Sequence, residues 1–381
     1  MGTTARKIAL LLMALTLAAC QRSVPPVQFH AQGLPQKLSD WQVLVNDGRT
    51  LRLNGGVQPF DLNTPLFSDY AHKLRTVWLP PGSSARYEAD KAFDFPVGTI
   101  ISKTFYFPLP AGKGWDGKSV ARTDPAESLV KAGQLDLSQV RLIETRLLVR
   151  RSEGWIALPY VWNEAQTEAT LMRIGALIPL ELVAADGTRE TADYQVPDQN
   201  QCASCHNTDN LARALQPIGP KARHLNRDYD YAGGRENQLA HWSRLGLLSG
   251  APEPAQAPRA AATHDRTAAL DARARAYLDI NCGHCHSAKG PANTSGLSLD
   301  VATDPGIHFG FCKQPVAAGK GTGNRLYDIK PGDAAGSVLL YRMESDDPAV
   351  MMPELGRSVM HAEGVKLISE WVDAQKGDCS L

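Results

Sequence analysis

Two five-residue strings in the chain, at 202–206 and 282–286, have the form Cys-x-x-Cys-His. This spacing sets two thiols one helical turn apart with an imidazole directly after the second, which suits covalent attachment of a haem: the thiols add to its vinyl groups and the histidine binds its iron. In a chain with seven Cys and ten His, one such string should occur by chance only about 0.003 times. We therefore expect two covalently bound haem c groups. The expected thioether residues are Cys202, Cys205, Cys282 and Cys285, and the expected iron ligands are His206 and His286.

Two other uses of Cys-x-x-Cys fit the sequence less well. A thioredoxin-like redox pair should lie near a βαβ pattern, which neither string has. A four-cysteine zinc site would normally close a shorter loop than the 77 residues between Cys205 and Cys282.

A second axial ligand for the second haem is offered by the loop at 351–356, Met-Met-Pro-Glu-Leu-Gly. A thioether is a soft ligand that favours reduced iron and raises the reduction potential, as suits an electron carrier. Met352 is the predicted ligand, because class I cytochromes c often carry Met-Pro at this point. Met351 and Met343 are the alternatives.

The first haem has less obvious second ligands. His224 is the first choice, with His241 and Met172 as alternatives. A vacant sixth position there would instead indicate ligand binding or catalysis.

The composition is that of a globular protein. The chain has 381 residues, of which 43% are hydrophobic and 21% charged, enough for two or three domains. Its 40 basic residues balance 40 acidic ones, so nucleic-acid binding through a basic surface is disfavoured.

The N-terminus has the pattern of an export signal. Arg6 and Lys7 precede a mostly apolar run at 8–19, which is shorter than the roughly 20 residues that a membrane span needs. The run ends in Leu-Ala-Ala-Cys, which resembles the bacterial lipobox, so we expect Cys20 to be acylated and to anchor the protein in a membrane. The alternative is an ordinary signal peptide with a chance cysteine. Gln21 favours sorting to the outer membrane.

Cys312 and Cys379 remain unassigned. An exported chain meets an oxidising compartment, so a disulfide across this interval of 67 residues is one expectation, and two unrelated buried thiols are the other.

The expected fold class is α+β multidomain: a β-rich N-terminal domain, then two c-type haem segments, the last an all-α class I cytochrome c-like domain. Strand-like runs occur at 99–107, 141–149, 155–162 and 178–184, and Asp186-Gly187 marks a hairpin. Amphipathic helices are expected directly before Cys282 and at about 362–375. The expected division is signal peptide 1–19, tether 20–34, β-rich domain 35–195, first haem segment 196–250, Pro/Ala-rich linker 251–263 and cytochrome c-like domain 264–381.

Five further strings resemble proteobacterial two-haem c-type cytochrome lipoproteins with a β-rich N-terminal region. They are Leu-Asn-Thr-Pro-Leu-Phe-Ser-Asp-Tyr at 62–70, Phe-Pro-Val-Gly-Thr at 95–99, Glu-Thr-Arg at 144–146, Pro-Val-Ala-Ala-Gly at 315–319 and Met-Pro-Glu-Leu-Gly at 352–356. Together with both haem strings, they span nearly the whole mature chain. The resemblance implies the architecture above and says little about the reaction.

Three functions are consistent with these features. The first is a lipid-anchored electron carrier on the periplasmic side of a bacterial membrane, exchanging electrons with redox partner proteins and having no catalytic residues. The second is a haem enzyme, such as a two-haem peroxidase with an open first haem. The third is a ligand-binding β-rich region served by the cytochrome part, for which Trp155, Tyr160 and Trp162 would be the aromatic residues.

Overall fold

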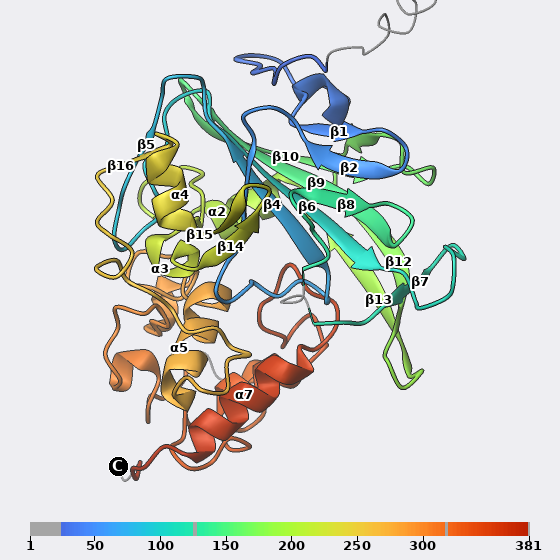
Figure 1. Cartoon of the computed structure of the whole chain (residues 1–381). Helices are drawn as coiled ribbons and strands as arrows, with labels where there is room; N and C mark the ends of the chain where they lie inside the picture. Colours follow the sequence, from blue (N-terminus) through green and yellow to red (C-terminus); the bar gives the residue numbers. More distant parts are fainter. Residues whose placement is uncertain (1–23, 125–127, 317–318, 380–381) are drawn as a thin grey trace, which may run out of the picture.

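The computed structural model describes residues 24–124, 128–316 and 319–379. Its centre is a six-stranded antiparallel sheet with the strand order β11-β10-β9-β6-β4-β3 (Figure 1). The predicted strands at 99–107, 141–149 and 155–162 are confirmed as β6, β9 and β10. The six strands are β3 (Gln58–Phe60), β4 (His72–Trp78), β6 (Ile100–Pro108), β9 (Val140–Arg151), β10 (Gly154–Trp162) and β11 (Ala169–Leu171).

One face of this sheet packs on the N-terminal elements. Leu74, Leu147 and Leu158 point into a large apolar core on this face, because alternate residues of a strand share a face. The indole of Trp41 donates a 2.7 Å hydrogen bond to the hydroxyl of Tyr160 across this core. The covering elements are a 3-10 helix (Leu38–Trp41) and a three-stranded sheet of β1 (Leu44–Asn46), β2 (Thr50–Leu53) and β8 (Gln134–Asp136).

A further three-stranded sheet contains the predicted hairpin. The run at 178–184 is confirmed as part of β12 (Ala176–Val183), which turns through Asp186-Gly187 into β13 (Arg189–Val196). The short β7 (Ser119–Ala121) pairs with β12 in parallel.

Small helices and hairpins cover part of the opposite face of the central sheet. Trp242 is fully buried in an apolar cluster that joins these elements to the sheet residues Phe60 and Val77. The elements are α2 (Gln199–His206), α3 (Ala222–Leu225), α4 (Gln238–Arg244), the hairpin of β14 (Asp228–Tyr231) and β15 (Gly234–Asn237), and the parallel pair of β5 (Ala85–Arg86) and β16 (Leu248–Ser249).

The segment 251–263, expected as a linker, is bonded to the preceding segment and to the β-rich region. The Ala260 amide donates to the Arg223 carbonyl at 2.7 Å, and the Thr64 hydroxyl donates to the Ala261 carbonyl at 2.8 Å.

The C-terminal region contains α5 (Leu270–Asn281), α6 (Val338–Glu344) and α7 (Ala362–Asp373). The expected helices before Cys282 and near 362–375 are thus confirmed as α5 and α7. Leu278 and Ile368 are fully buried where these two helices pack together, and the Trp371 indole donates to Asp271 at 2.8 Å. The three-residue 3-10 helices of this region are Asn293–Ser295, Ile307–Phe309 and Lys320–Thr322.

The predicted fold class is wrong. The chain is mostly β-rich, with 26% strand and 18% helix, and its C-terminal helical region is small, with no evidence of a class I cytochrome c fold in the described residues. The physical reason lies between α5 and α6, where Gly and Pro recur every few residues and limit helix to single 3-10 turns.

The C-terminal region is also bonded directly to the sheet region. The Asn281 side chain accepts a hydrogen bond from the Phe67 amide at 2.9 Å, and the Asp69 carboxylate accepts from the amides of Ser358 and Val359 at 2.6 and 3.0 Å. In Figure 1 this region lies against one end of the sheet and the small helices beside it. Side chains of both regions therefore line the space between them.

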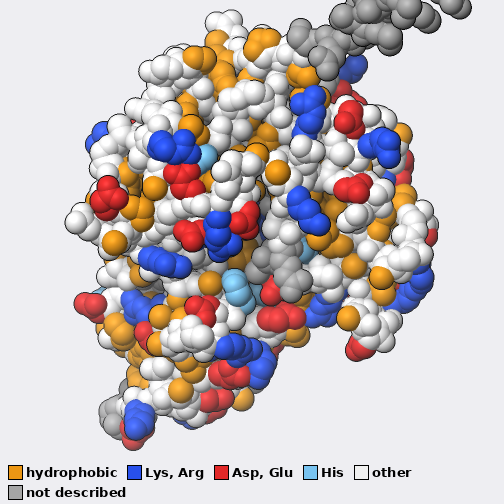
Figure 2. Space-filling view, in the orientation of Figure 1, with side chains coloured by type: hydrophobic (Ala, Val, Ile, Leu, Met, Phe, Trp, Pro, Cys, Tyr) orange, Lys and Arg blue, Asp and Glu red, His pale blue; other side chains and the backbone are white. Residues whose placement is uncertain are grey.

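The visible surface carries both signs of charge. Figure 2 shows acidic and basic side chains interspersed over this face, with no large area of one sign. Within the described ranges, no helix has both the length and the apolar character needed to cross a bilayer.

Candidate functional site

A cavity of about 900 Å³ lies between the sheet region and the C-terminal region, and both Cys-x-x-Cys-His strings line it. This volume is near the upper end of the roughly 300–1,000 Å³ typical of ligand sites. The structure therefore brings together two strings that lie 80 residues apart along the chain. All six residues predicted to attach haem or bind iron from these strings line the cavity: Cys202, Cys205, His206, Cys282, Cys285 and His286.

The first string lies on α2. Asp198 caps this helix by accepting a hydrogen bond from the Gln201 amide at 2.8 Å. Nδ1 of His206 donates to the Gln216 carbonyl at 2.8 Å, and the Gln216 amide donates back to the His206 carbonyl at 2.8 Å. This pairing fixes the ring and leaves Nε2 as the unprotonated nitrogen. Burial lowers the pKa of His206 to about 3, so the imidazole is neutral.

The second string begins where α5 ends. The His286 amide donates to the Cys282 carbonyl at 2.8 Å, so the string forms one further helical turn. Nδ1 of His286 lies 3.3 Å from the hydroxyl of Ser295, which itself donates to the Ala292 carbonyl and so accepts from the imidazole. Burial lowers the pKa of His286 to about 4. Both histidines are thus neutral, with Nδ1 used and Nε2 available as a metal ligand.

The glycine of the second string is required by packing. A Cβ at Gly283 would lie 2.8 Å from the Asp279 carbonyl oxygen and 3.0 Å from the Cα of Asp300. The backbone of this string therefore approaches its neighbours too closely for any side chain at this position.

The four cysteines of the strings are free thiols. Burial raises the pKa of Cys202 to about 11 and that of Cys282 and Cys285 to about 12, and it also raises the pKa of Cys205. Reactive redox pairs and zinc sites need thiolates, which positive surroundings stabilise and burial disfavours. These environments argue against a reactive redox pair and are compatible with thioether formation.

The two strings are direct neighbours in space. The Asn210 amide, just after the first string, donates to the Lys289 carbonyl, just after the second, at 2.7 Å. The thiol of Cys205 is also one of the groups that raise the pKa of Cys285. Two groups attached to these strings would share one cavity.

Of the three methionines considered for the second haem, Met352 and Met343 line the cavity. Met351 is buried and is not among the lining residues. The guanidinium of Arg357 holds the loop by donating to the carbonyls of Met352 and Ser345 at 3.0 and 2.8 Å. The structure thus presents Met352 on an anchored loop in the wall of the cavity.

The three residues considered for the first haem lie elsewhere. Nε2 of the buried His224 donates to Asp279 at 2.8 Å, beside the Arg223–Asp279 ion pair that joins α3 to α5. His241 is engaged with Glu236 at 2.7 Å. Neither histidine lines the cavity, nor does Met172. The structure does not bring any of them to His206.

Sequence reasoning missed two cationic residues of the cavity wall, Lys103 on β6 and Arg146 on β9. Both belong to strands that are otherwise mostly apolar. The alternation of residues between the two faces of each strand is the sequence signal that could have identified them. Residues at every second position share a face, so a charged residue there stands among core-facing neighbours. Arg146 pairs with Glu144 at 2.8 Å, and Tyr194 donates to the same carboxylate at 2.7 Å.

The aromatic residues considered for a ligand site in the β-rich region belong to the core. Tyr160 and Trp162 are buried, and their polar atoms are satisfied within the protein by Trp41, Pro35 and Thr145. Trp155 is 9% exposed and packs on Phe95.

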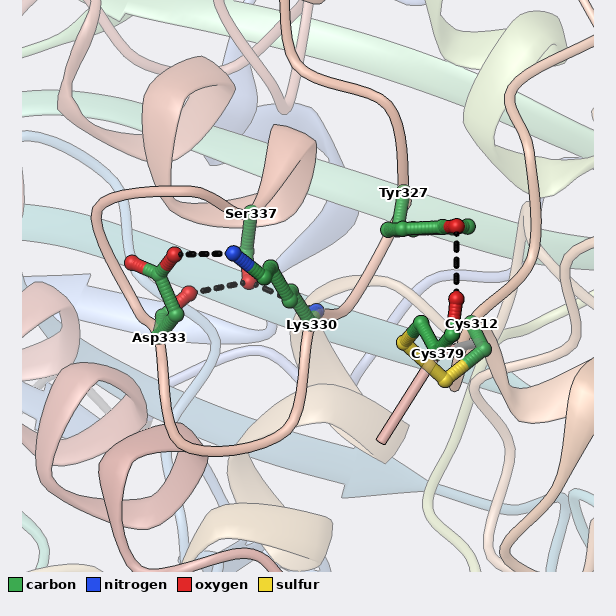
Figure 3. Close-up of a disulfide and its surroundings, with 6 residues drawn as sticks. All are labelled: Cys312, Tyr327, Lys330, Asp333, Ser337 and Cys379. Atoms are coloured by element: carbon green, nitrogen blue, oxygen red, sulfur yellow. Dashed lines mark hydrogen bonds and ion pairs between the residues drawn. A yellow bond between two sulfur atoms is a disulfide. The ribbon is translucent and has the colours of Figure 1, made fainter. Parts of the chain in front are cut away.

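The remaining cysteines are placed as follows. Cys312 and Cys379 form a disulfide that ties the C-terminal end to the chain near the cavity wall, with the Tyr327 hydroxyl donating to the Cys379 carbonyl at 2.9 Å (Figure 3). Cys20 lies outside the described residues.

The donor set fits a haem better than a metal ion held by protein alone. In the part of the chain that the structure describes, no three His, Cys, Asp or Glu side chains are grouped to hold a metal ion. A haem iron does not need such a group, because the porphyrin supplies its equatorial ligands and the protein adds one or two axial ones. The thiols and Nε2 atoms of the cavity are the groups that attachment requires.

Comparison with known proteins adds no identity: no family model, curated protein or solved structure matches the chain. Function must therefore be argued from the site.

Proposed function

We propose that the chain covalently binds two haem c groups in one cavity and transfers electrons. The observation that carries the proposal is the shared cavity. Each string contributes two neutral thiols and one neutral imidazole to it. Each imidazole uses Nδ1 inside the protein, the arrangement that orients Nε2 toward a metal. The chain is proposed as an electron carrier without catalytic residues.

Bound haem supplies one-electron redox chemistry. The protein's contribution is to hold the two attachment strings side by side through the backbone bond from Asn210 to Lys289. Apolar wall residues such as Leu148, Leu299 and Val338 limit water in the cavity. A low local polarity favours the less charged state of a redox centre and so tunes its potential.

The proposed setting is the periplasmic side of a bacterial outer membrane, with redox partner proteins as donor and acceptor. The balance of acidic and basic residues supports protein partners over nucleic acid. A lipid anchor at Cys20 would keep the described part of the chain, which begins at residue 24, close to the membrane surface.

A second candidate function is a haem enzyme, such as a two-haem peroxidase. The observation in its favour is that His224, His241 and Met172 all lie outside the cavity. An iron bound only by His206 would have an open site for a small ligand.

The test of the proposed function is a haem count on the matured native protein. Haem staining after denaturing electrophoresis and the pyridine haemochrome spectrum should give two covalently bound haems per chain. A protein matured in cells that attach haem c, yet carrying none, would contradict the proposal.

The membrane anchor gives a separate prediction. Because Leu-Ala-Ala-Cys follows the apolar run, the mature chain should begin at an acylated Cys20. Mass spectrometry of protein extracted from membranes should find a lipid-modified N-terminal peptide starting there. Cys20→Ser should release the protein into the soluble periplasmic fraction, whereas a free N-terminus at another residue would be evidence against lipidation.

A further inference from the structure

The cavity that His206 lines has part of its wall in the central sheet. In this wall β6 contributes Lys103 and β9 contributes Arg146. These two strands therefore offer candidates for the sixth ligand of the first iron, an inference that rests on the proposed function.

Lys103 stands in a row of cations across the sheet. In the strand register it is paired with Arg75 of β4 on one side and with Arg146 of β9 on the other. Directly paired residues of adjacent strands share a face, so the three side chains lie next to one another. All three belong to the face toward the small helices and the C-terminal region.

Lys103 differs from its two neighbours because it has no partner of opposite charge. Arg75 bonds to Asp61 at 2.7 Å, and Arg146 bonds to Glu144 at 2.8 Å. Among the described residues, Lys103 makes no hydrogen bond or ion pair, and its amine lies 5.6 Å from the ring centroid of Phe105. The Glu144 carboxylate acts on Lys103 but is itself bonded by Arg146 and Tyr194, so the Lys103 amine keeps no hydrogen bond of its own and is available to a ligand inside the cavity.

Lys103 shares the cavity with the first string. It lines the same cavity as Cys205 and His206, and its ammonium group is one of the groups that lower the pKa of both. The amine therefore borders the space that a haem attached to this string would occupy.

We propose that the amine of Lys103 is the sixth ligand of the iron held by His206. A neutral amine has a lone pair suited to iron, as imidazole does. Burial, with Arg75 and Arg146, lowers the pKa of Lys103 to about 7, in agreement with this role. The first site is then closed, which favours the carrier over the two-haem enzyme.

Two histidines of the cavity wall are weaker candidates. His361 stacks on Phe67 with ring centroids 4.1 Å apart and shares a 3.0 Å hydrogen bond with the Tyr277 hydroxyl. His284 lies between the two cysteines of the second string, so its backbone is committed to the other haem.

The test is Lys103→Arg, which keeps the positive charge and removes a coordinating amine. The haem count should stay at two per chain, while one of the two ferric haems changes from low spin to high spin in the electron paramagnetic resonance spectrum. The high-spin share should rise from none to half of the total haem, and that half should bind added cyanide rapidly. Two low-spin haems in Lys103→Arg would overturn the proposal. Arginine keeps the positive charge but cannot coordinate iron, so this result would mean that Lys103 acts only through its charge.

Lys103→Met gives a second measurement, which does not require the cavity to accommodate an arginine side chain. Methionine is also long, apolar and able to coordinate iron. The red absorption band of the Met–iron bond should double in intensity relative to the native protein, and an unchanged band would overturn the assignment.

Lys73→Arg is the matched control. Lys73 is buried one strand away, donates to the Ala71 carbonyl at 2.9 Å and does not line the cavity, so both haems should stay low spin. If His284→Ala contains a high-spin haem and the spectrum of Lys103→Arg equals that of the native protein, the sixth ligand is His284 and not Lys103. Absence of covalent haem from the native chain would instead contradict the proposed function itself.

Discussion

Replacing Cys282 and Cys285 by serine is expected to halve the covalently bound haem, from two groups per chain to one. Serine preserves the size and hydrogen bonding of cysteine but cannot form a thioether with a vinyl group. The first string should keep its haem, because α2 is capped by Asp198 and His206 is held by Gln216, both outside the second string. The pyridine haemochrome spectrum and the mass of the intact chain measure this loss directly.

The matched control is the double variant Cys312→Ser and Cys379→Ser. It also removes two cysteines from the C-terminal region, but these form a disulfide and are not among the cavity-lining residues. The haem count should stay at two, with a loss of stability of about 2–4 kcal/mol from opening the cross-link. Equal haem in the Cys282/Cys285 variant and in this control would show that the second string does not attach haem.

The strands were predictable where alternation and turn chemistry agree. The runs that became β6, β9 and β10 are rich in β-branched and aromatic residues and are bounded by turns, so local preference and tertiary packing coincide. Asp186-Gly187 predicted its hairpin correctly, because the turn requires a positive φ and Gly187 has a φ of 86°.

The class of the C-terminal region was not predictable from its two amphipathic helices. α5 and α7 are present, but what defines a fold is how the intervening chain packs. The described residues between α5 and α6, 282–316 and 319–337, form loops, a helical turn at 282–286 and single 3-10 turns. Long-range bonds such as Asn281 to Phe67 and Asp69 to Ser358 tie this region to the sheet. Sequence periodicity contains no information on such contacts.

The candidate site was predictable only as far as its motifs. The spacing of the strings identified six residues of the cavity, but it could not show that both strings line one space. His224 was chosen by residue type, whereas its actual partner, the Asp279 carboxylate that it shares with Arg223, depends on the docking of α3 against α5. Lys103 was missed because a lysine in a strand is usually solvated, and only the sheet register reveals its two cationic neighbours.

The proposed second haem gives the other large expected effect, through its proposed methionine ligand. Met352→Ala is expected to abolish the weak red absorption band of a Met–iron bond and to lower the potential of that haem. The reason is that a thioether stabilises reduced iron more than water or a nitrogen ligand does. A fall of about 0.1–0.3 V is reasonable, since axial ligands set haem potentials over about 0.8 V. A spectroelectrochemical titration resolves the two haems and measures the shift.

The choice between the methionines follows from their positions. Met351→Ala is the closest control, because Met351 precedes Met352 directly and is buried away from the cavity wall. That variant should keep the red band and both potentials. Met343 also lines the cavity, from α6, so Met343→Ala tests the remaining alternative. Loss of the band in Met343→Ala, with the band retained in Met352→Ala, would show that α6 and not the anchored loop supplies the ligand.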